Sequence, residues 1–483
     1  MILVVDVGTT GLRAGIVTPA GDVRHVEYRS FAPASPLPGM VEFDAARLGE
    51  LVLDAAGATL ASADNPDLTG VGIANQRASA VMWERGSGTP VGPGIGWQDL
   101  RTIGECLTAK AEHGLALAPN QTATKVQWLL ANAAAGRNHA DLCVGTVDSW
   151  VAWVLSAGDV HVTDHTNAAV TGLYSIERSG WNERTCELLG IDAAMLPSIV
   201  DTIGVFGNAN ALPGAPPMAS IAGDQQASLL GQGCVTPGMA KVTFGTGGML
   251  DVCTGDAAPT SPNRSGRGTF PIVAWSKGGT LTWGAEAIML SAGTNVEWLV
   301  DDLELLDSPA QSHEVASSVS TTDGVVYVPA LLGLGTPNWD YGARGTLLGL
   351  TRGSERPHIV RAVLEGVAQR GADMVEAAEA DTGLTIPSLR LDGGMSRNPT
   401  FVQAVADASR KPVEVSATPE ATTLGAGFAA GVATGVWSSL QEAGATHRPS
   451  ATVEPGDALD RERWAEAMRR TGAWIPELSA LDF

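Results

Sequence analysis

Basic residues are scarce in this chain. Lysine and arginine together number 30 against 52 aspartates and glutamates, so the 483 residues carry a formal net charge of −22. Such a balance repels the phosphates of nucleic acids and the anionic surfaces of membranes, and we expect neither as a partner. An anionic ligand could bind only where backbone N–H groups, a helix terminus or a metal ion reverse the sign locally.

Cysteine and long apolar segments are also scarce. The five cysteines lie far apart, with no CxxC sequence and no histidine cluster nearby, which indicates small buried side chains in a reducing compartment. No uncharged apolar run approaches the roughly 20 residues that span a bilayer. Residues 1–6 lack the basic segment of a signal peptide and already contain Asp6. We therefore expect a cytoplasmic protein.

The length suits two hydrophobic cores of about 200 residues each, with a cleft between the two bodies. The two halves also begin alike. A strand, a polar turn and a returning strand are predicted at residues 2–5, 6–11 and 14–17, and again at residues 239–244, 245–248 and 249–253.

Strands and helices alternate through the rest of the chain. Strands are predicted at residues 23–31, 68–73, 324–330, 389–391 and 413–416, and helices from Asp44 to about residue 62 and at residues 357–381, 399–408 and 422–434. This alternation predicts an α/β fold. We place an N-terminal domain at residues 1–234, a C-terminal domain at residues 235–440 and a partly helical appendage at residues 441–483.

The first glycine-containing turn is a candidate for binding phosphate. Asp6 ends its strand, Gly8 permits a close approach of a ligand to the backbone, and Thr9 and Thr10 supply hydroxyls. Arg13 follows on the returning strand. A carboxylate at this place could hold Mg²⁺, usually through its water shell.

The second turn contains Gly245 and Thr246 in a still more open sequence. A glycine- and threonine-rich hairpin alone is an ordinary turn in most proteins, but a pair of them could clamp the phosphates of ATP across a cleft. The chain has no GxxxxGK[ST] sequence, which excludes a P-loop. A dinucleotide-binding fingerprint also fits badly, because the second turn leads into a strand and not a helix.

Three further polar positions leave alternatives open. Residues 392–394, Asp-Gly-Gly, follow a predicted strand and suit either a flat ligand such as adenosine or a plain loop. Asn398 could cap the next helix or contact the ribose or base. Asp224 lies between an apolar strand end and a helix start, where an acid serves either as a helix cap or as a general base.

A series of spaced motifs resembles the FGGY carbohydrate kinases, and most closely their glycerol kinase branch. The motifs run in order from residue 2 to about residue 437: residues 6–10, 75–77, 146–150, 161–164, 222–226, 244–247, 333–340, 343–345, 349–353 and 391–394. The resemblance implies two actin-like, RNase H-type ATPase domains with an interdomain cleft. It also implies ATP and Mg²⁺ as cofactors, a small polyol or sugar as the substrate, and a possible homo-oligomer.

The resemblance also implies roles for single residues. Asp224 matches the general base, and Asp6 and Asp224 match carboxylates that associate with Mg²⁺, largely through water. The positions that match the nucleotide site are Thr9, Thr10, Arg13, Gly245, Thr246, Gly394 and Asn398. Those that match the acceptor site are Gln76, Arg77, Trp97, Asp224 and Gln225.

Three acceptor positions depart from the glycerol kinase branch, because Ala78 replaces a glutamate, Asn120 a tyrosine and Met249 a phenylalanine. The loss of a carboxylate that accepts a hydrogen bond should cost about 1–3 kcal/mol of glycerol binding. Two of the three replacements also remove bulk, so we expect a larger pocket, and a larger acceptor is an alternative: a tetritol, a pentitol or a pentulose. Asn120 could also be misaligned, with the pocket rebuilt from its neighbours.

The sequence also bears on regulation and on two rival functions. Residues 207–216 correspond to a loop that binds a sugar bisphosphate effector in relatives, but they contain no arginine or lysine, so we expect that regulation to be absent. The rivals are a non-catalytic actin- or chaperone-type ATPase and a sugar-sensing pseudokinase. The acceptor motifs around Arg77, Trp97 and Asp224 argue against the first, and the intact Asp6 and Asp224 against the second.

Overall fold

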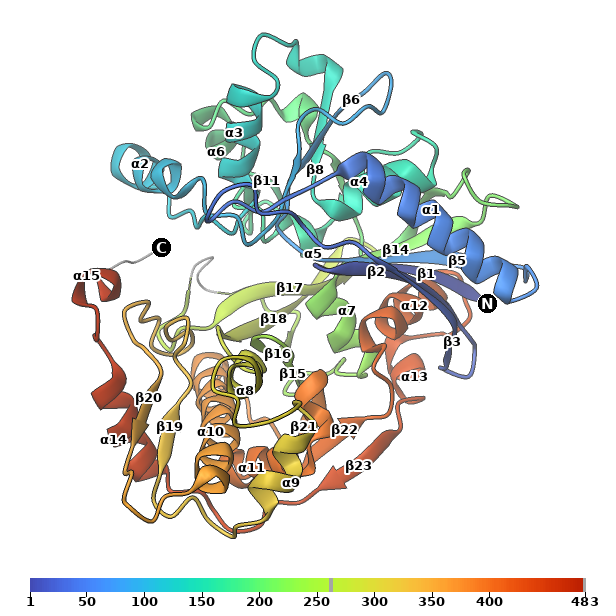
Figure 1. The fold of residues 1–483 in the computed structure, drawn as a ribbon. Coiled ribbons are helices and arrows are strands. Elements are labelled where there is room, and N and C mark those ends of the chain that lie inside the picture. Colours follow the sequence, from blue (N-terminus) through green and yellow to red (C-terminus); the bar gives the residue numbers. More distant parts are fainter. Residues whose placement is uncertain (260–263, 481–483) are drawn as a thin grey trace.

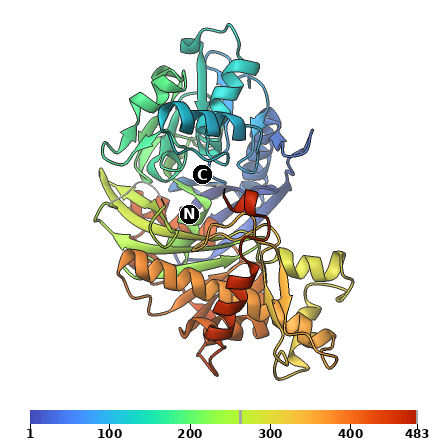
Figure 2. The ribbon, with the colours of Figure 1, turned by 90° about the vertical axis from the view of Figure 1, so that its left-hand side faces the viewer.

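Two lobes stand one above the other, the upper built from the N-terminal half and the lower from the C-terminal half (Figure 1). The computed structural model describes residues 1–259 and 264–480. A view turned by a quarter circle shows the same division, with strands β17 (Phe270–Lys277) and β18 (Thr280–Met289) near the junction (Figure 2). Helices and strands are layered in both lobes, which confirms the predicted α/β class.

The upper lobe is built on a mixed sheet. Strands β1 (Ile2–Val7), β2 (Gly11–Val17) and β3 (Val23–Ser30) form an antiparallel meander, and β5 (Gly70–Asn75) and β14 (Pro217–Gly223) continue the sheet parallel to β1. Every residue of β1 and β5 is buried. Their nearly unbroken apolar sequences suit strands that are covered on both faces.

Helices from both ends of the chain cover this sheet. Helix α1 (Ala45–Ser62) lies against β2 and β3, and it begins as predicted, because the Asp44 side chain accepts a hydrogen bond from the Arg47 N–H at 3.0 Å. Helix α12 (Ala421–Ala433) belongs to the second half of the sequence but packs on β1, β5 and β14. The upper core is therefore completed by a helix from the far end of the chain.

The lower lobe repeats the arrangement. Strands β15 (Ala240–Phe244) and β16 (Gly248–Gly255) form the second predicted hairpin, and β18 and β17 extend it antiparallel. On the other side, β21 (Leu389–Asp392) and β22 (Val413–Ser416) run parallel to β15. Helix α10 (Arg356–Thr382) lies against β16 and β18, and α11 (Pro399–Ser409) packs on α10.

One sheet joins the lobes. Strand β13 (Ile203–Asn208) pairs with β14 in the upper lobe and meets β17 of the lower lobe at Ile203 and Lys277. Within the described residues the strand order is β23-β22-β21-β15-β16-β18-β17-β13-β14-β5-β1-β2-β3. The lobes are thus linked by strand pairing as well as by helices.

The C-terminal segment is integrated into the lower lobe. Strand β23 (Pro449–Val453) pairs with β22 at the edge of the sheet, and α14 (Arg461–Thr471) packs against β19 (Val326–Val328). The Arg461 guanidinium donates to the Asp373 carboxylate of α10 at 2.7 Å. This segment, described to residue 480, therefore completes a sheet as well as adding helices.

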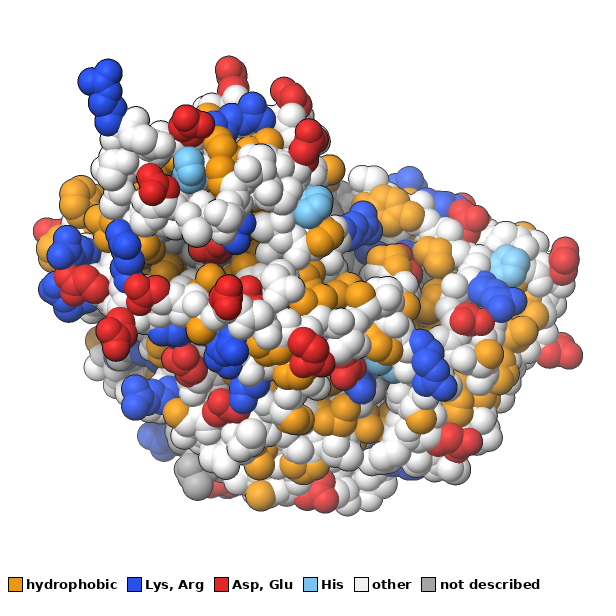
Figure 3. All heavy atoms as spheres, turned by 90° about the horizontal axis from the view of Figure 1, so that it is seen from below, with side chains coloured by type: hydrophobic (Ala, Val, Ile, Leu, Met, Phe, Trp, Pro, Cys, Tyr) orange, Lys and Arg blue, Asp and Glu red, His pale blue; other side chains and the backbone are white. Residues whose placement is uncertain are grey.

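The cysteines and the charged surface side chains are arranged as the composition leads one to expect. The five cysteines are unbridged and buried, as predicted. Acidic and basic side chains are interspersed with apolar ones on the lower face (Figure 3). Over residues 1–259 and 264–480, no helix combines the length and the apolar character that crossing a membrane requires.

Helices α7 (Asp224–Gly231) and α12 cross between the lobes in close contact. A Cβ atom on Gly231 would overlap the Ala421 carbonyl oxygen, and one on Gly425 would overlap the Ala227 carbonyl oxygen. Glycine is therefore required at both positions by the closeness of the two backbones.

Gly425→Ala should destabilise the protein by about 1–3 kcal/mol, because the added methyl group must push the two helices apart. Chemical denaturation of the variant and the parent measures the difference. Gly57→Ala is the matched control: Gly57 lies in α1 with no atom within 4 Å of an added Cβ, so this variant should be slightly stabilised. Equal stability of the Gly425 variant and the parent would contradict the packing argument.

Candidate active site between the two lobes

The parallel strands of the upper lobe end at one edge of the sheet. Val7 of β1 lies opposite Asn75 of β5, and Asn75 lies opposite Gly223 of β14. Ligands of such sheets bind beyond the carboxyl ends of the strands. Arg77 and Asp224 follow two of these ends, so the register brings the first turn, the Asn-Gln-Arg motif and the candidate base together.

The lower lobe presents its turns in the same way. Thr243 of β15 lies opposite Asp392 of β21, so the second turn and the Asp-Gly-Gly loop leave the sheet side by side. Gly393 has a φ of 91°, and a Cβ there would overlap the Phe244 backbone, whereas Gly394 has no atom within 4 Å of an added Cβ. The loop therefore rests on the hairpin through Gly393 and keeps open space at Gly394.

Backbone hydrogen bonds hold both turns. The Gly8 N–H donates to the Gly11 carbonyl at 2.9 Å, and the Gly245 N–H donates to the Gly247 carbonyl at 2.9 Å. The N-terminus of α8 (Thr294–Asp301) supports the second turn, because the Gly293 N–H donates to the Gly245 carbonyl at 2.8 Å. Both turns are preorganised by the lobe that carries them.

Asp6 lies near the end of β1 and is 5% exposed. Its carboxylate accepts a long hydrogen bond of 3.5 Å from the Thr423 hydroxyl and lies 3.8 Å from the Arg13 Nε. Burial raises the pKa of Asp6 to about 7, Arg13 opposes this, and the negative charge of Asp224 adds to it. Arg13 also forms an ion pair of 2.5 Å with Glu420 of the lower half, so it bridges the halves beside the first turn.

Asp224 is the first residue of α7 and is not its cap, since Gly223 holds that position. Its carboxylate accepts a hydrogen bond from the Gln225 N–H at 2.8 Å and lies 3.6 Å from the Arg77 Nε. Burial raises the pKa of Asp224, while Arg77 and the Gln225 N–H lower it. The side chain remains 29% exposed, so a ligand can reach it.

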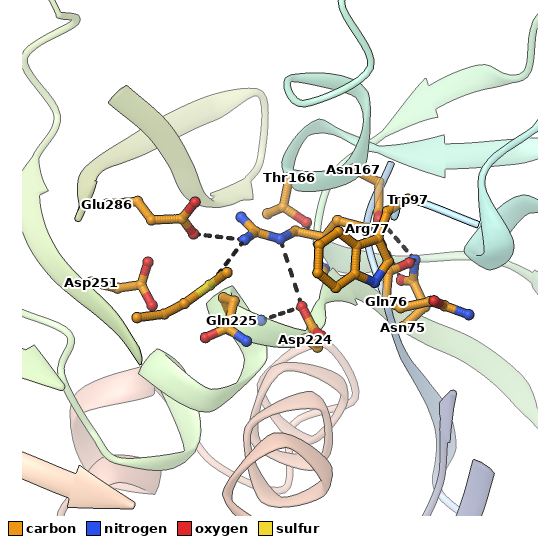
Figure 4. Close-up of polar contacts among 12 residues, drawn as sticks. Asn75, Gln76, Arg77, Trp97, Thr166, Asn167, Asp224, Gln225, Asp251 and Glu286 are labelled. Atoms are coloured by element: carbon orange, nitrogen blue, oxygen red, sulfur yellow. Dashed lines mark hydrogen bonds and ion pairs between the residues drawn. The ribbon is translucent and has the colours of Figure 1, made fainter. Parts of the chain in front are cut away.

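Arg77 extends from the upper lobe to the lower one (Figure 4). Its Nη2 forms an ion pair of 2.6 Å with Glu286 of β18 and lies 3.8 Å from the Met249 sulfur of β16. Gln225 also meets the lower lobe, since its side-chain oxygen accepts a hydrogen bond of 2.6 Å from the Lys241 ammonium of β15. The residues around Asp224 thus come from both lobes.

Comparison with known proteins identifies this arrangement. Residues 1–231 match the N-terminal domain of the FGGY family of carbohydrate kinases, and residues 240–434 match the C-terminal domain of that family. The chain belongs to the FGGY family. It is an ATP-dependent carbohydrate kinase, a phosphotransferase with an alcohol group as acceptor, and its lobes have the actin-like fold that the motifs implied. The rival assignment to a non-catalytic actin-type ATPase is not favoured.

Full-length relatives are similar to this kinase. A glycerol kinase of Aromatoleum aromaticum is 40% identical, with 98% of this chain and 99% of the relative covered. One of Koribacter versatilis is 39% identical, with 98% of each covered. The crystal structure of Plasmodium falciparum glycerol kinase with ADP superposes with a TM-score of 0.88 at 27% identity and covers 98% of both chains.

Other predicted site residues of the FGGY kinase lie as follows. Trp97, a predicted acceptor residue, donates its indole N–H to the Thr9 hydroxyl of the first turn at 3.2 Å. Ala78 is buried and has a left-handed φ of 60°. Gln76 is also buried, and its backbone N–H donates to the Val7 carbonyl at 2.7 Å.

The structure shows the surroundings of two further predicted site residues, Asn120 and Asn398. Asn120 is exposed in a turn. The carbonyls of its neighbours Pro119 and Gln121 accept hydrogen bonds from the Lys125 ammonium. The exposed position of Asn120 gives no support for an acceptor role. Asn398 caps α11, because its oxygen accepts from the Phe401 N–H at 3.1 Å while its nitrogen donates to Ser312 at 2.9 Å. Asn398 therefore caps α11, and a contact of its side chain with the ribose or base stays a prediction.

A buried polar network that sequence reasoning missed supports Asp224. The Asp164 carboxylate accepts from the Thr166 hydroxyl at 2.8 Å, and the oxygen of that hydroxyl accepts from the Gly223 N–H at 2.8 Å. Asn167, also bound to Asp164, exchanges side-chain hydrogen bonds with Asn75. The network thus anchors the ends of β5 and β14 from which Arg77 and Asp224 emerge. Its residues lie in or beside motifs of the family resemblance, but nothing in their spacing reveals these contacts.

The neighbouring Asp148 predicts a pH effect on stability. Burial raises its pKa to about 7 despite hydrogen bonds from Thr146 and Thr163, so the folded state binds a proton that the unfolded state has released. The proton bound by Asp148 therefore stabilises the folded state in acid, and this contribution is lost as the pH rises through about 7. The free energy of unfolding of Asp148→Asn, measured relative to that of the parent, should therefore be higher at about pH 8 than at about pH 5 by roughly 2–3 kcal/mol. Denaturant titrations at both pH values test this, and a pH-independent difference would contradict it.

Proposed function

We propose that this kinase transfers the γ-phosphate of ATP to a terminal hydroxyl of glycerol. The proposal rests chiefly on the 40% identity to a glycerol kinase over nearly the full length of both chains. The relative with a TM-score of 0.88 is a glycerol kinase solved with ADP, which supports a nucleotide site of the same kind here. The replacements at Ala78 and Met249 are the observations that favour a larger acceptor.

Asp224 is proposed as the general base. Its side chain is partly exposed between the lobes and its raised pKa makes it a better proton acceptor than an ordinary aspartate. As the acceptor oxygen attacks the γ-phosphorus, its proton passes to the Asp224 carboxylate and the bond to the leaving ADP oxygen breaks. Closure of the lobes keeps out water that would otherwise accept the phosphate.

The two turns are proposed to hold the transferred phosphate. Thr9 and Thr10 offer hydroxyls from the upper lobe, and Gly245 and Thr246 offer backbone N–H groups from the lower lobe. Gly394, with open space around it, suits the adenosine end. Arg13, already paired with Glu420, lies beside the first turn and contributes positive charge there.

Asp6 and Asp224 are the residues that would hold Mg²⁺. Among the described contacts, the long hydrogen bond from Thr423 and the 3.8 Å ion pair with Arg13 both involve one oxygen of Asp6, so the other oxygen can contact the water shell of the ion. No cluster of three or more metal-binding side chains occurs within residues 1–259 and 264–480, which agrees with an ion that keeps water and phosphate ligands. When bound, Mg²⁺ supplies neutralisation of phosphate charge.

Asp224→Asn should lower kcat by about 10²–10⁴-fold, because the amide cannot take the proton of the acceptor. ADP binding, measured by calorimetry, should stay close to that of the parent. A nearly normal turnover rate would overturn the assignment of the base.

The acceptor is tested by a screen and by one substitution. The kcat/KM for glycerol should be higher than that for tetritols, pentitols and pentuloses. A higher kcat/KM for one of these would contradict glycerol as the acceptor and identify that compound in its place. Ala78→Glu should lower the KM for glycerol by about five- to a hundredfold, because the added carboxylate can accept a hydrogen bond from a hydroxyl.

Ala78→Gln is the matched control for this substitution, since it adds similar volume without the charge and should gain less. An unchanged or higher KM in the folded glutamate variant would contradict the predicted role of this position.

The remaining expectations stay predictions from the sequence. They are a cytoplasmic location, a possible homo-oligomer, and the absence of nucleic-acid and membrane partners. Residues 207–216, between β13 and β14, contain no cation for a sugar bisphosphate, so insensitivity to such an effector is also proposed.

A further inference from the structure

The lower lobe carries a row of buried charges at its boundary with the upper lobe. Lys241 of β15 lies opposite Asp251 of β16, and Asp251 lies opposite Glu286 of β18. Lys241 and Asp251 have no exposed side-chain area, and Glu286 is 5% exposed. Residues directly opposite one another on neighbouring strands lie on one face of the sheet, so the three side chains form a continuous row.

The row ends on two residues of the upper half. At one end, Glu286 forms the 2.6 Å ion pair with Arg77 (Figure 4). At the other end, Lys241 donates to the Gln225 side-chain oxygen at 2.6 Å and pairs with Asp251 at 2.7 Å. Both Arg77 and Gln225 belong to the proposed acceptor site, on either side of Asp224.

A contribution to the stability of the fold does not explain why these charges are buried. Buried ion pairs contribute little net stability, and well-packed apolar residues in their place are often neutral or stabilising. The cost is visible in Glu286, whose pKa burial and the neighbouring Asp251 raise to about 7 although Arg77 opposes this. A charged row that is costly to bury and ends on two substrate-site residues indicates a role in the site.

Each end of the row determines which atoms its partner can offer to a ligand. An ammonium can only donate, so Lys241 occupies the carbonyl oxygen of Gln225 and leaves the amide N–H groups to donate elsewhere. Glu286 occupies the Nη2 of Arg77, and the buried Nη1 has no partner among the described residues. Arg77 and Gln225 therefore both present donors beside Asp224, which is the acceptor.

We propose that Glu286 and Lys241 are positioning residues, which orient Arg77 and Gln225 so that the acceptor site is complete only when the lower lobe meets the upper one. The inference rests on the proposed function, in which Arg77 and Gln225 contact the acceptor. It makes acceptor affinity, and not nucleotide affinity, the property that depends on these contacts between the lobes.

Kinetics of Glu286→Gln and Lys241→Met test the proposal with the best acceptor found in the screen. The KM for this acceptor should rise at least about tenfold, as expected when charge-assisted hydrogen bonds that orient a ligand are weakened. The KM for ATP and the kcat at saturating acceptor should change by less than about threefold. An unchanged acceptor KM in both folded variants would overturn the inference.

Double-mutant cycles separate positioning from a general effect on the fold. If Glu286 acts through Arg77, Glu286→Gln should add no further rise in KM to an Arg77→Met variant; additive effects would contradict the proposal. Glu365→Gln is the matched control, because Glu365 forms a comparable 2.7 Å pair with Arg361 on α10. It should leave the acceptor KM unchanged, and a rise equal to that of Glu286→Gln would count against the proposal.

Folding and function are controlled separately. Lys241→Met leaves the buried Asp251 without its cation, so Lys241→Met/Asp251→Asn provides a second variant with no unpaired buried charge and the same expected rise in KM. A parent enzyme that turns over no polyol or sugar refutes the proposed function. An active parent with variants of normal acceptor KM refutes only the positioning role.

Discussion

Burial of negative charge at the junction of the lobes is the constraint on which the site depends. Asp6 and Glu286 are buried and Asp224 is partly exposed, and burial raises the pKa of each. A buried carboxylate is tolerated only when cations or hydrogen-bond donors face it. Arg13 and Arg77 provide this, and each reaches from one half of the chain to an acid of the other. The charged residues of the candidate site therefore also form contacts between the two halves of the chain.

The scaffold that permits this is a repeated one. Each lobe delivers a polar turn and a neighbouring strand end to the same edge of its sheet, and the close crossing of α7 and α12 sets the two edges against each other. Glycine at positions 231 and 425 allows the backbones of these two helices to lie in close contact. Lobes that stood further apart could not bring Arg77 within 2.6 Å of Glu286.

Much of the fold followed from local signals. The Asp44 cap, the two hairpins and the predicted helix at residues 357–381 agree with the structure within a few residues, because capping and hydrophobic periodicity act over one or two turns. The hairpin β17–β18 was not predicted, although the sequence Gly278-Gly279 at its turn is typical of a tight hairpin. Both glycines have positive φ in the structure. Its strands are mostly buried, so they show little of the alternation that marks an exposed strand.

The sequence by itself determined the class of protein: two α/β halves, paired glycine turns, a kinase family and the candidate base Asp224. Tertiary structure alone decided that Arg13 pairs with Glu420, that Asn398 caps a helix and that Asn120 is exposed. It also decided that Lys241 contacts Gln225 and that Glu286 contacts Arg77. Motifs specify residues that are close along the chain. Contacts such as Arg77 with Glu286 join residues 209 positions apart, and only the packing of the lobes determines which distant charges meet.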